Sequence, residues 1–287
     1  MSRDTEWMRA WPAPAKLNLF LHVVGRRADG YHLLQTVFRF ISLADSLRFE
    51  PRSNGRIELA TPTPGVPPEQ DLVVRAAASL QAAIKVGAGG TAQGATIHLE
   101  KHIPQGGGLG GGSSDAATTL LALNHLWGGG LSRTELQALG LTLGADVPIF
   151  IHGQTAFAEG VGERFTDVTA PADWYLLSMP DVAVPTLEIF RSPALRRDTP
   201  AIRPADWRPG FGHNDLEPVA CALYPEVARH VEYLRRYGEA RMTGSGACCF
   251  VAFTEEDAAQ DALLSLPGNI KGRVVRGLAS HPLSALT

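Results

Sequence analysis

A glycine-rich loop constrains this chain more than any other feature, because six of the seven residues from Gly106 to Gly112 are glycine. The loop follows a strand-like segment, Ala95 to Glu100, and leads into a helical pattern over residues 113–127. Glycine lets the backbone approach a bulky anion and adopt positive φ without a steric penalty. The free N–H groups and positive dipole of the following helix favour phosphate. The loop therefore predicts a phosphate-binding site. The alternative, a flexible linker, is disfavoured because linkers rarely lead into so regular a helix.

Two familiar phosphate-binding loops do not fit this segment. Gly106-x-Gly108-x-x-Gly111 formally matches the dinucleotide fingerprint, which needs a tight strand-to-helix turn and an acidic residue about 20 positions later. Here Pro104 interrupts the connection, and Leu131 occupies the later position. A P-loop needs Lys-Ser or Lys-Thr after its last glycine, and no lysine stands there. A cation for the phosphates has to come from elsewhere in the chain.

The candidates for that cation are few, since the chain has four lysines: Lys16, Lys85, Lys101 and Lys271. Lys16 lies on a predicted strand, residues 16–23, on the face opposite the leucines. By itself this pattern favours a lysine at the surface. Asp146, two residues before Pro148, is by itself most simply a helix N-cap. The segment 243–247 is either a tight turn or a second loop that faces a ligand.

The remaining patterns predict an α+β fold with a boundary near residues 153–162. Asp29-Gly30 predicts a turn between strands 16–23 and 31–43, and Asn54-Gly55 predicts a hairpin over 48–59. Asp71 is a plausible N-cap, and Ser132 with Glu135 forms a capping box. Further strands are expected at 174–179, 248–253 and 274–278, a hairpin at 155–165, a short helix near Leu187, and helices at 226–237 and 258–266.

Composition excludes several classes of protein. Twenty-six basic and 29 acidic residues give a net charge of −3, so no global charge drives binding to nucleic acid or anionic membranes. Residues 1–9 do not resemble a signal peptide, and no apolar run approaches the about 20 residues of a membrane helix. The three cysteines form no disulfide framework or zinc motif. We expect a soluble protein of the cytoplasm.

Four ordered motifs together resemble those of the GHMP kinase superfamily over nearly the whole chain. They are Pro14 to Leu19, the loop from Pro104 to Ser114, Gly144 to Pro148, and Met242 to Ala247. The resemblance implies an N-terminal α+β domain like that of ribosomal proteins, residues 1–160, and a ferredoxin-like α+β domain, residues 161–287. The active site is then expected in the cleft between the two domains.

The resemblance also implies roles for individual residues. Lys16 and Asp146 match the catalytic pair, and Asn18 is expected to orient it. ATP, with Mg²⁺, would be bound by the loop residues Pro104, Gln105, Gly106, Gly107, Gly108, Leu109, Gly110, Gly111, Gly112, Ser113 and Ser114. Together with Gly25 to His32, the motifs are similar to those of the members that phosphorylate 4-diphosphocytidyl-2-C-methyl-D-erythritol in the non-mevalonate route to isopentenyl diphosphate. Tyr31, His32 and Phe190 would hold the cytosine of that substrate.

Three other functions remain open at this point. A kinase of the same superfamily could act on mevalonate, homoserine or a sugar, although Tyr31-His32 argues against this. A nucleotide-binding regulator could have kept the fold and lost catalysis, although Lys16 and Asp146 are both present. RNA binding is disfavoured by the net charge and by the absence of clustered basic residues with interleaved aromatics. We expect a monomer or homodimer that acts on a small molecule.

Overall fold

The computed structural model describes residues 6–62, 66–88, 93–171 and 173–286. Its strands form one mixed sheet in the order β3-β4-β2-β10-β7-β9-β8, with β1 and β5 also paired to β2, and β6 paired to β5. The strands are β1 (Trp11–Arg26), β2 (His32–Arg52), β3 (Ile57–Leu59), β4 (Gly94–Glu100), β5 (Ala156–Glu159), β6 (Arg164–Asp167), β7 (Trp174–Ser178), β8 (Arg241–Met242), β9 (Cys249–Phe253) and β10 (Gly272–Leu278). The predicted α+β character is thereby confirmed.

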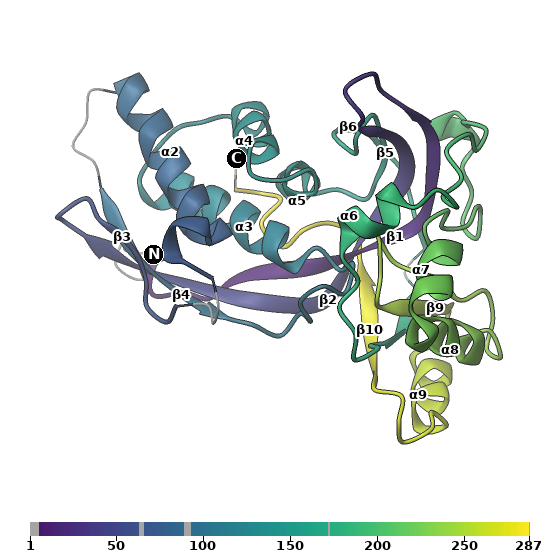
Figure 1. Ribbon diagram of the computed structural model, residues 1–287. Helices are drawn as coiled ribbons and strands as arrows, with labels where there is room; N and C mark the ends of the chain where they lie inside the picture. Colours follow the sequence, from purple (N-terminus) through teal and green to yellow (C-terminus); the bar gives the residue numbers. More distant parts are fainter. Residues whose placement is uncertain (1–5, 63–65, 89–92, 172, 287) are drawn as a thin grey trace.

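The helices form two groups (Figure 1). Helices α2 to α5 lie together beside the long β1–β2 pair, and α7 to α9 lie around β9 at the other end of the molecule. The helices are α2 (Leu72–Ala88), α3 (Gly111–Leu126), α4 (Arg133–Leu141), α5 (Val147–His152), α6 (Thr186–Arg191), α7 (Glu217–Leu223), α8 (Pro225–Leu234) and α9 (Glu256–Leu264), with short 3₁₀ turns at Pro68–Gln70 and Pro204–Asp206. None of these helices is long and apolar enough to cross a membrane.

Strands β1 and β2 form the hairpin that Asp29-Gly30 predicted. Gly30 has a φ of 90°, and the Asp29 carboxylate accepts a hydrogen bond of 3.2 Å from the amide of Tyr31. The pairing register of β1 and β2 shifts between Pro14 and Lys16 and again between Asn18 and Leu21. Such irregularities redirect side chains locally, and here they flank the two polar residues of β1 that the resemblance places in the active site.

The predicted hairpin over 48–59 is wrong. Strand β4 pairs antiparallel with β2, from Ser46 opposite Glu100 to Arg52 opposite Gly94, and thereby takes the edge that a hairpin would use. The chain turns at Gly55, which has a φ of 70°, and β3 pairs in parallel with the far edge of β4. The sequence correctly predicts the turn at Asn54-Gly55, but the strand after it pairs with β4 and not with the strand before it.

Four clusters of buried apolar side chains support the sheet in the described residues, and the two largest are the cores under the helices. The first contains side chains of α2, α3 and α5 and of the sheet, such as Leu80, Leu120, Phe150 and Phe49. The second lies under α7 and α8 and includes Val23 from the distal half of β1. After β10 the chain returns to the first core, where Leu283 is buried. Strand β1 therefore contributes to both cores and also to the two smaller clusters, which contain Leu17 and Phe20.

Candidate active site

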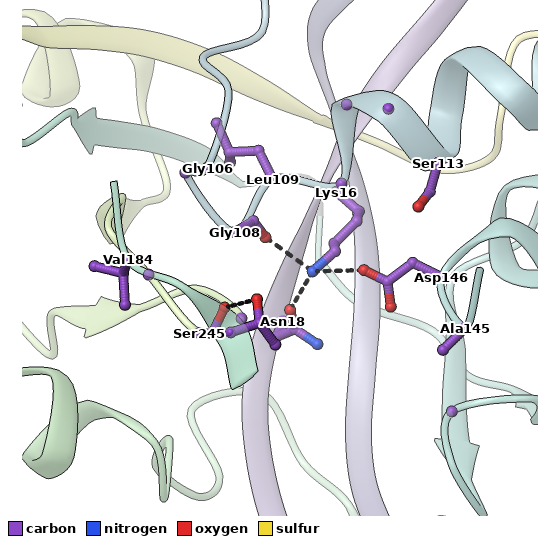
Figure 2. A pocket seen from close by; sticks show the side chains of 18 of the residues that line it. Lys16, Asn18, Gly106, Gly108, Leu109, Ser113, Ala145, Asp146, Val184 and Ser245 are labelled. Carbon is purple, nitrogen blue, oxygen red and sulfur yellow. Dashed lines mark hydrogen bonds and ion pairs between the residues drawn. The ribbon is translucent and has the colours of Figure 1, made fainter. Parts of the chain in front are cut away.

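A cavity of about 1250 Å³ contains most of the residues that the resemblance placed in an active site. Its walls come from β1, the glycine loop, the start of α5, the 244–246 turn and α6. The lining residues among those predicted are Lys16, Asn18, Tyr31, His32, Asp146, Phe190 and the loop from Pro104 to Ser113. Segments distant in the sequence thus meet around one space, part of which is shown in Figure 2.

Backbone hydrogen bonds from two other segments hold the glycine loop in place. Gly106, Gly108 and Gly110 have φ values of 67°, 73° and 74°, which favour glycine. The amide of Lys16 donates to the carbonyl of Leu109 at 3.0 Å, and the amide of Cys248 donates to Gly107 at 3.1 Å. These bonds hold the loop between β1 and the start of β9, with the N-terminus of α3 directly after it.

The two serines after the loop differ in their surroundings. Ser113 lines the cavity. Ser114 is fully buried, and its hydroxyl donates to the carbonyl of Pro14 at 2.7 Å, so its side chain ties α3 to β1. Neither serine caps the helix, because α3 begins at Gly111 and its N-cap is Gly110.

Lys16 is buried, with 3% of its side chain exposed, which excludes the surface position that its strand pattern favoured. Its ammonium donates to Asn18 Oδ1 at 2.6 Å and to the carbonyl of Gly108 at 2.8 Å, and it lies 3.5 Å from Asp146 Oδ2. Figure 2 shows these three contacts converging on the Nζ atom. Lys16 thereby connects the glycine loop to the start of α5.

Asp146 occupies the N-cap position of α5, but its side chain accepts no hydrogen bond from that helix. With 39% of the side chain exposed, its carboxylate extends into the cavity toward Lys16. Pro148 in the first turn of α5 has no N–H group, so one of the donors that a capping side chain would otherwise accept from is absent. The N-cap interpretation therefore describes the position of Asp146 but not its contacts.

Asn18 is fixed by Thr36, which the sequence analysis does not single out, and by Thr243 of the 243–247 segment. Its Nδ2 donates to Thr36 Oγ1 at 3.0 Å, and its backbone amide donates to Thr243 Oγ1 at 3.0 Å. The 243–247 segment thus supports the site through Thr243, and Gly244, Ser245 and Gly246 line the cavity. Ser245 also exchanges a hydrogen bond of 2.7 Å with Thr186 of α6.

Aromatic side chains lie in another part of the cavity. Tyr31 is 65% exposed, and the rings of His32 and Phe190 contact each other with centroids 4.9 Å apart. Burial lowers the pKa of His32, and the charges of Arg197 and Arg26 lower it further. This part of the cavity therefore offers uncharged ring faces.

A charged cluster beside α3 was not predicted. The Lys101 ammonium lies 2.6 Å from Asp115 Oδ2 and also contacts the Asp45 carboxylate. Burial raises the pKa of Asp115 to about 7, against the opposing effect of Lys101. Asp45 also accepts a hydrogen bond of 2.8 Å from the amide of Ile103. The cluster fixes the segment that leads into the glycine loop, and only the scarcity of lysine pointed to it in the sequence.

Comparison with known proteins identifies the family. The GHMP kinases N terminal domain matches residues 71–154, and the GHMP kinases C terminal domain matches residues 202–271. The 4-diphosphocytidyl-2-C-methyl-D-erythritol kinase of Dechloromonas aromatica is 60% identical over 96% of this chain and 100% of its own length. Its counterpart in Thiobacillus denitrificans is 58% identical over 96% of this chain and 97% of its own.

Solved structures agree with this result. A crystal structure of 4-(cytidine 5'-diphospho)-2C-methyl-D-erythritol kinase is 36% identical, with a TM-score of 0.78 over 94% of this chain and 99% of the other. A mevalonate kinase, at 15% identity and a TM-score of 0.64, shares the fold. The predicted resemblance and fold class are confirmed, while the boundary between residues 160 and 161 stays a prediction. The chain belongs to the GHMP kinases, which are ATP-dependent phosphotransferases, and within them to the 4-diphosphocytidyl-2-C-methyl-D-erythritol kinase family.

Proposed function

We propose that this chain transfers the γ-phosphoryl group of ATP to the 2-hydroxyl of 4-diphosphocytidyl-2-C-methyl-D-erythritol, a step of the non-mevalonate route to isopentenyl diphosphate. One observation carries the proposal: a single cavity holds the Lys16–Asp146 pair, the glycine loop and the Tyr31–His32–Phe190 group. Such a cavity suits an acceptor that joins a nucleobase to an alcohol. The names of the relatives support the same substrate.

The glycine loop is the proposed site for the ATP phosphates. Backbone N–H groups between Gly106 and Ser114 are the donors, and α3 is 16 residues long and directs its positive dipole end toward the loop. The glycines leave space for this contact. A Cβ atom at Gly108 would stand 2.1 Å from the carbonyl oxygen of Thr243, so the two segments approach closely only because no side chain intervenes.

Asp146 is the proposed general base. Phosphoryl transfer asks mainly for positioning and charge neutralisation, and a carboxylate exposed in the cavity can accept the hydroxyl proton of the acceptor. Lys16, 3.5 Å from that carboxylate and 2.8 Å from the Gly108 carbonyl, offsets negative charge between the base and the phosphate loop. Asn18 holds the ammonium in this position through its 2.6 Å hydrogen bond.

Mg²⁺ is proposed to accompany ATP. It is a hard cation that binds phosphate oxygens with one or two protein oxygens and several waters. The Asp146 carboxylate and the Ser113 hydroxyl are oxygen donors that line the cavity near the glycine loop, and their chemistry fits such a cation. When bound, Mg²⁺ would neutralise charge on the phosphates.

Tyr31, His32 and Phe190 are the proposed cytosine site. An aromatic ring provides a face for stacking a base, and the ring of Tyr31 is available because it is 65% exposed. The His32–Phe190 pair lines the same cavity. The cytidine diphosphate group would then extend toward Lys16 and Asp146.

Product analysis tests the proposal. Purified protein is incubated with Mg·ATP and 4-diphosphocytidyl-2-C-methyl-D-erythritol, with mevalonate and homoserine as control acceptors, while ADP release and product mass are followed. We expect a gain of one phosphoryl group with the first acceptor alone. Turnover restricted to a control alcohol would exclude the cytosine site. ATP binding without turnover of any acceptor would favour the regulator.

A further inference from the structure

Arg197 lies beside the proposed cytosine site and directs nearly all of its donors into the protein. Its Nε donates to His32 Nε2 at 3.0 Å, and its Nη1 donates to the carbonyl of Leu195 at 2.9 Å. Its Nη2 donates to the carbonyls of Phe190 and Ser192 at 3.0 and 2.7 Å. A guanidinium has five N–H donors, so four are used here. Arg197 thus connects the ring of His32 to the chain that follows Phe190.

The segment around Arg197 is anchored on both sides. Leu195 is buried in the second core. The amide of Thr199 donates to the carbonyl of Val23 at 3.1 Å, and its hydroxyl donates to the buried carboxylate of Asp215 at 2.7 Å. The same carboxylate accepts a 2.7 Å hydrogen bond from the amide of Val23. Arg197 is therefore held against β1 and has little freedom to leave His32.

The contact with Arg197 determines which nitrogen of His32 carries the proton. A guanidinium only donates hydrogen bonds, so Nε2 of His32 must accept and has no hydrogen. The lowered pKa of His32, caused by burial and then by Arg197 and Arg26, keeps the ring uncharged near neutral pH. In an uncharged ring without a hydrogen at Nε2, Nδ1 is protonated. Within the described part of the chain no hydrogen bond reaches this Nδ1, and the ring lines the cavity.

We propose that Arg197 is a positioning residue for base specificity, which holds His32 in the Nδ1–H form so that the cavity presents a hydrogen-bond donor to the base. N3 of cytosine is an acceptor and completes this bond. N3 of uracil carries a hydrogen, so two donors would meet and both would lose their partners. The inference rests on the proposed function for the identity of the base, but the protonation of His32 in the free protein does not depend on it.

Nitrogen-15 NMR of the histidine rings tests the first step in the unaltered protein. We expect His32 to show an unprotonated Nε2 and a protonated Nδ1, and the Nδ1 signal to move on addition of CDP more than of UDP. The Arg197→Met variant removes every donor but keeps an unbranched side chain, and it should shift the ring toward the Nε2–H form. Arg196→Met is the matched control, since Arg196 is 57% exposed and, among the described residues, forms a hydrogen bond and an ion pair with Asp198 alone.

Kinetics test the second step. With the cytidine substrate, Arg197→Met should raise KM about 10- to 100-fold, with little change in kcat or in KM for ATP. The ratio of kcat/KM for the cytidine substrate to kcat/KM for the same molecule with uracil in place of cytosine should fall by a similar factor. Arg196→Met should match the original protein. A protonated Nε2 in the unaltered protein, or an unchanged base preference in a folded Arg197→Met variant, would overturn the inference. A protonated Nδ1 without turnover of the cytidine substrate would instead refute the proposed function alone.

Discussion

The ammonium of Lys16, on β1, lies 3.5 Å from the carboxylate of Asp146, at the start of α5. Taken alone, the sequence pattern favours a surface lysine and a helix N-cap. The structure excludes the first, and it places Asp146 at the N-cap position without a capping hydrogen bond. Lys16 is buried against the glycine loop, and the Asp146 side chain makes no capping hydrogen bond. A buried ammonium contributes its charge where little water screens it. This geometry supports the proposal that the pair acts at the phosphoryl group during transfer.

Lys16→Met should lower kcat by about 100- to 1000-fold, because the loss of one preorganised charged donor has an effect of that size. Lys271→Met is the matched control, since Lys271 is 72% exposed and lies 3.6 Å from an exposed aspartate. The measurement is steady-state turnover, with circular dichroism to show that both variants fold. Equal activity of the two variants would remove Lys16 from the catalytic pair.

Gly108→Ala should abolish ATP binding. An added Cβ would meet the backbone of Thr243 at 2.1 Å, and Gly108 also has a positive φ of 73°. Gly128→Ala separates the two effects, because Gly128 has a φ of 65° but no atom within 4 Å of the added Cβ. This control should lose only about 1–2 kcal/mol of stability from backbone strain and should bind ATP normally. Titration calorimetry with both variants measures the difference, and normal ATP affinity in Gly108→Ala would contradict the role of the loop.

Local signals in the sequence predicted much of the fold. The Asp29-Gly30 turn, the Ser132–Glu135 capping box and the start of α2 after Asp71 depend on neighbouring residues, and the structure confirms them. Helix α7 was missed. Its beginning is fixed by Asn214, whose Oδ1 accepts a hydrogen bond of 2.9 Å from the amide of Leu216, with a proline in the first turn. Both signals are local, since Asn214 and Pro218 lie four residues apart.

Local patterns do not predict which strands pair, or which side chains meet, when the segments are distant in the sequence. Strand β3 pairs with β4 because β4 occupies the edge of β2. No residue near Asn54 indicates this pairing. The Lys101–Asp115 contact and the Arg197–His32 hydrogen bond likewise join segments that meet only in the folded chain. The family resemblance points to Lys16 and Asp146 as the proposed catalytic pair, but no local pattern indicates which side chains hold these residues in place.

Tyr31→Ala should raise KM for the cytidine substrate about 10- to 100-fold, because stacking of a base on an aromatic ring contributes about 1–3 kcal/mol. The value of kcat should change little, since the ring is expected to contact the base rather than the reacting oxygen. Tyr31→Phe keeps the ring face and should behave like the original protein. Initial rates at varied substrate and at varied ATP check this prediction. An effect confined to KM for ATP would mean that the base and ATP sites are interchanged.

The stability of the fold should depend on pH through His281, which is fully buried and whose Nδ1 accepts a hydrogen bond of 3.0 Å from the amide of Leu283. Burial, with a further contribution from Arg133, lowers its pKa to about 3. The unfolded chain takes up a proton at this residue below its ordinary pKa of about 6.5, whereas the folded chain stays uncharged until about pH 3. The stabilising effect of the neutral ring is therefore complete above pH 6.5 and is lost as the pH falls.

From this residue alone, the free energy of unfolding should fall by about 1.4 kcal/mol per pH unit below pH 6. Asparagine keeps an acceptor at this position and does not titrate in this range, so His281→Asn should show a shallower dependence by that amount. Urea unfolding at pH 7, 6 and 5 provides the comparison. If the free energy of unfolding fell equally with pH in both proteins, His281 would take up its proton at the same pH in the folded and the unfolded chain.

The transfer step itself gives the most direct test of the proposed catalytic pair. Rapid-quench single turnovers with the protein in excess over 4-diphosphocytidyl-2-C-methyl-D-erythritol report chemistry separately from product release, and Asp146→Asn preserves shape while removing the base. We predict that the variant binds both substrates with affinities within a few-fold of the original and transfers the phosphoryl group at least about 100-fold more slowly. Transfer at the original rate in a folded Asp146→Asn variant would contradict the role of Asp146 as the base.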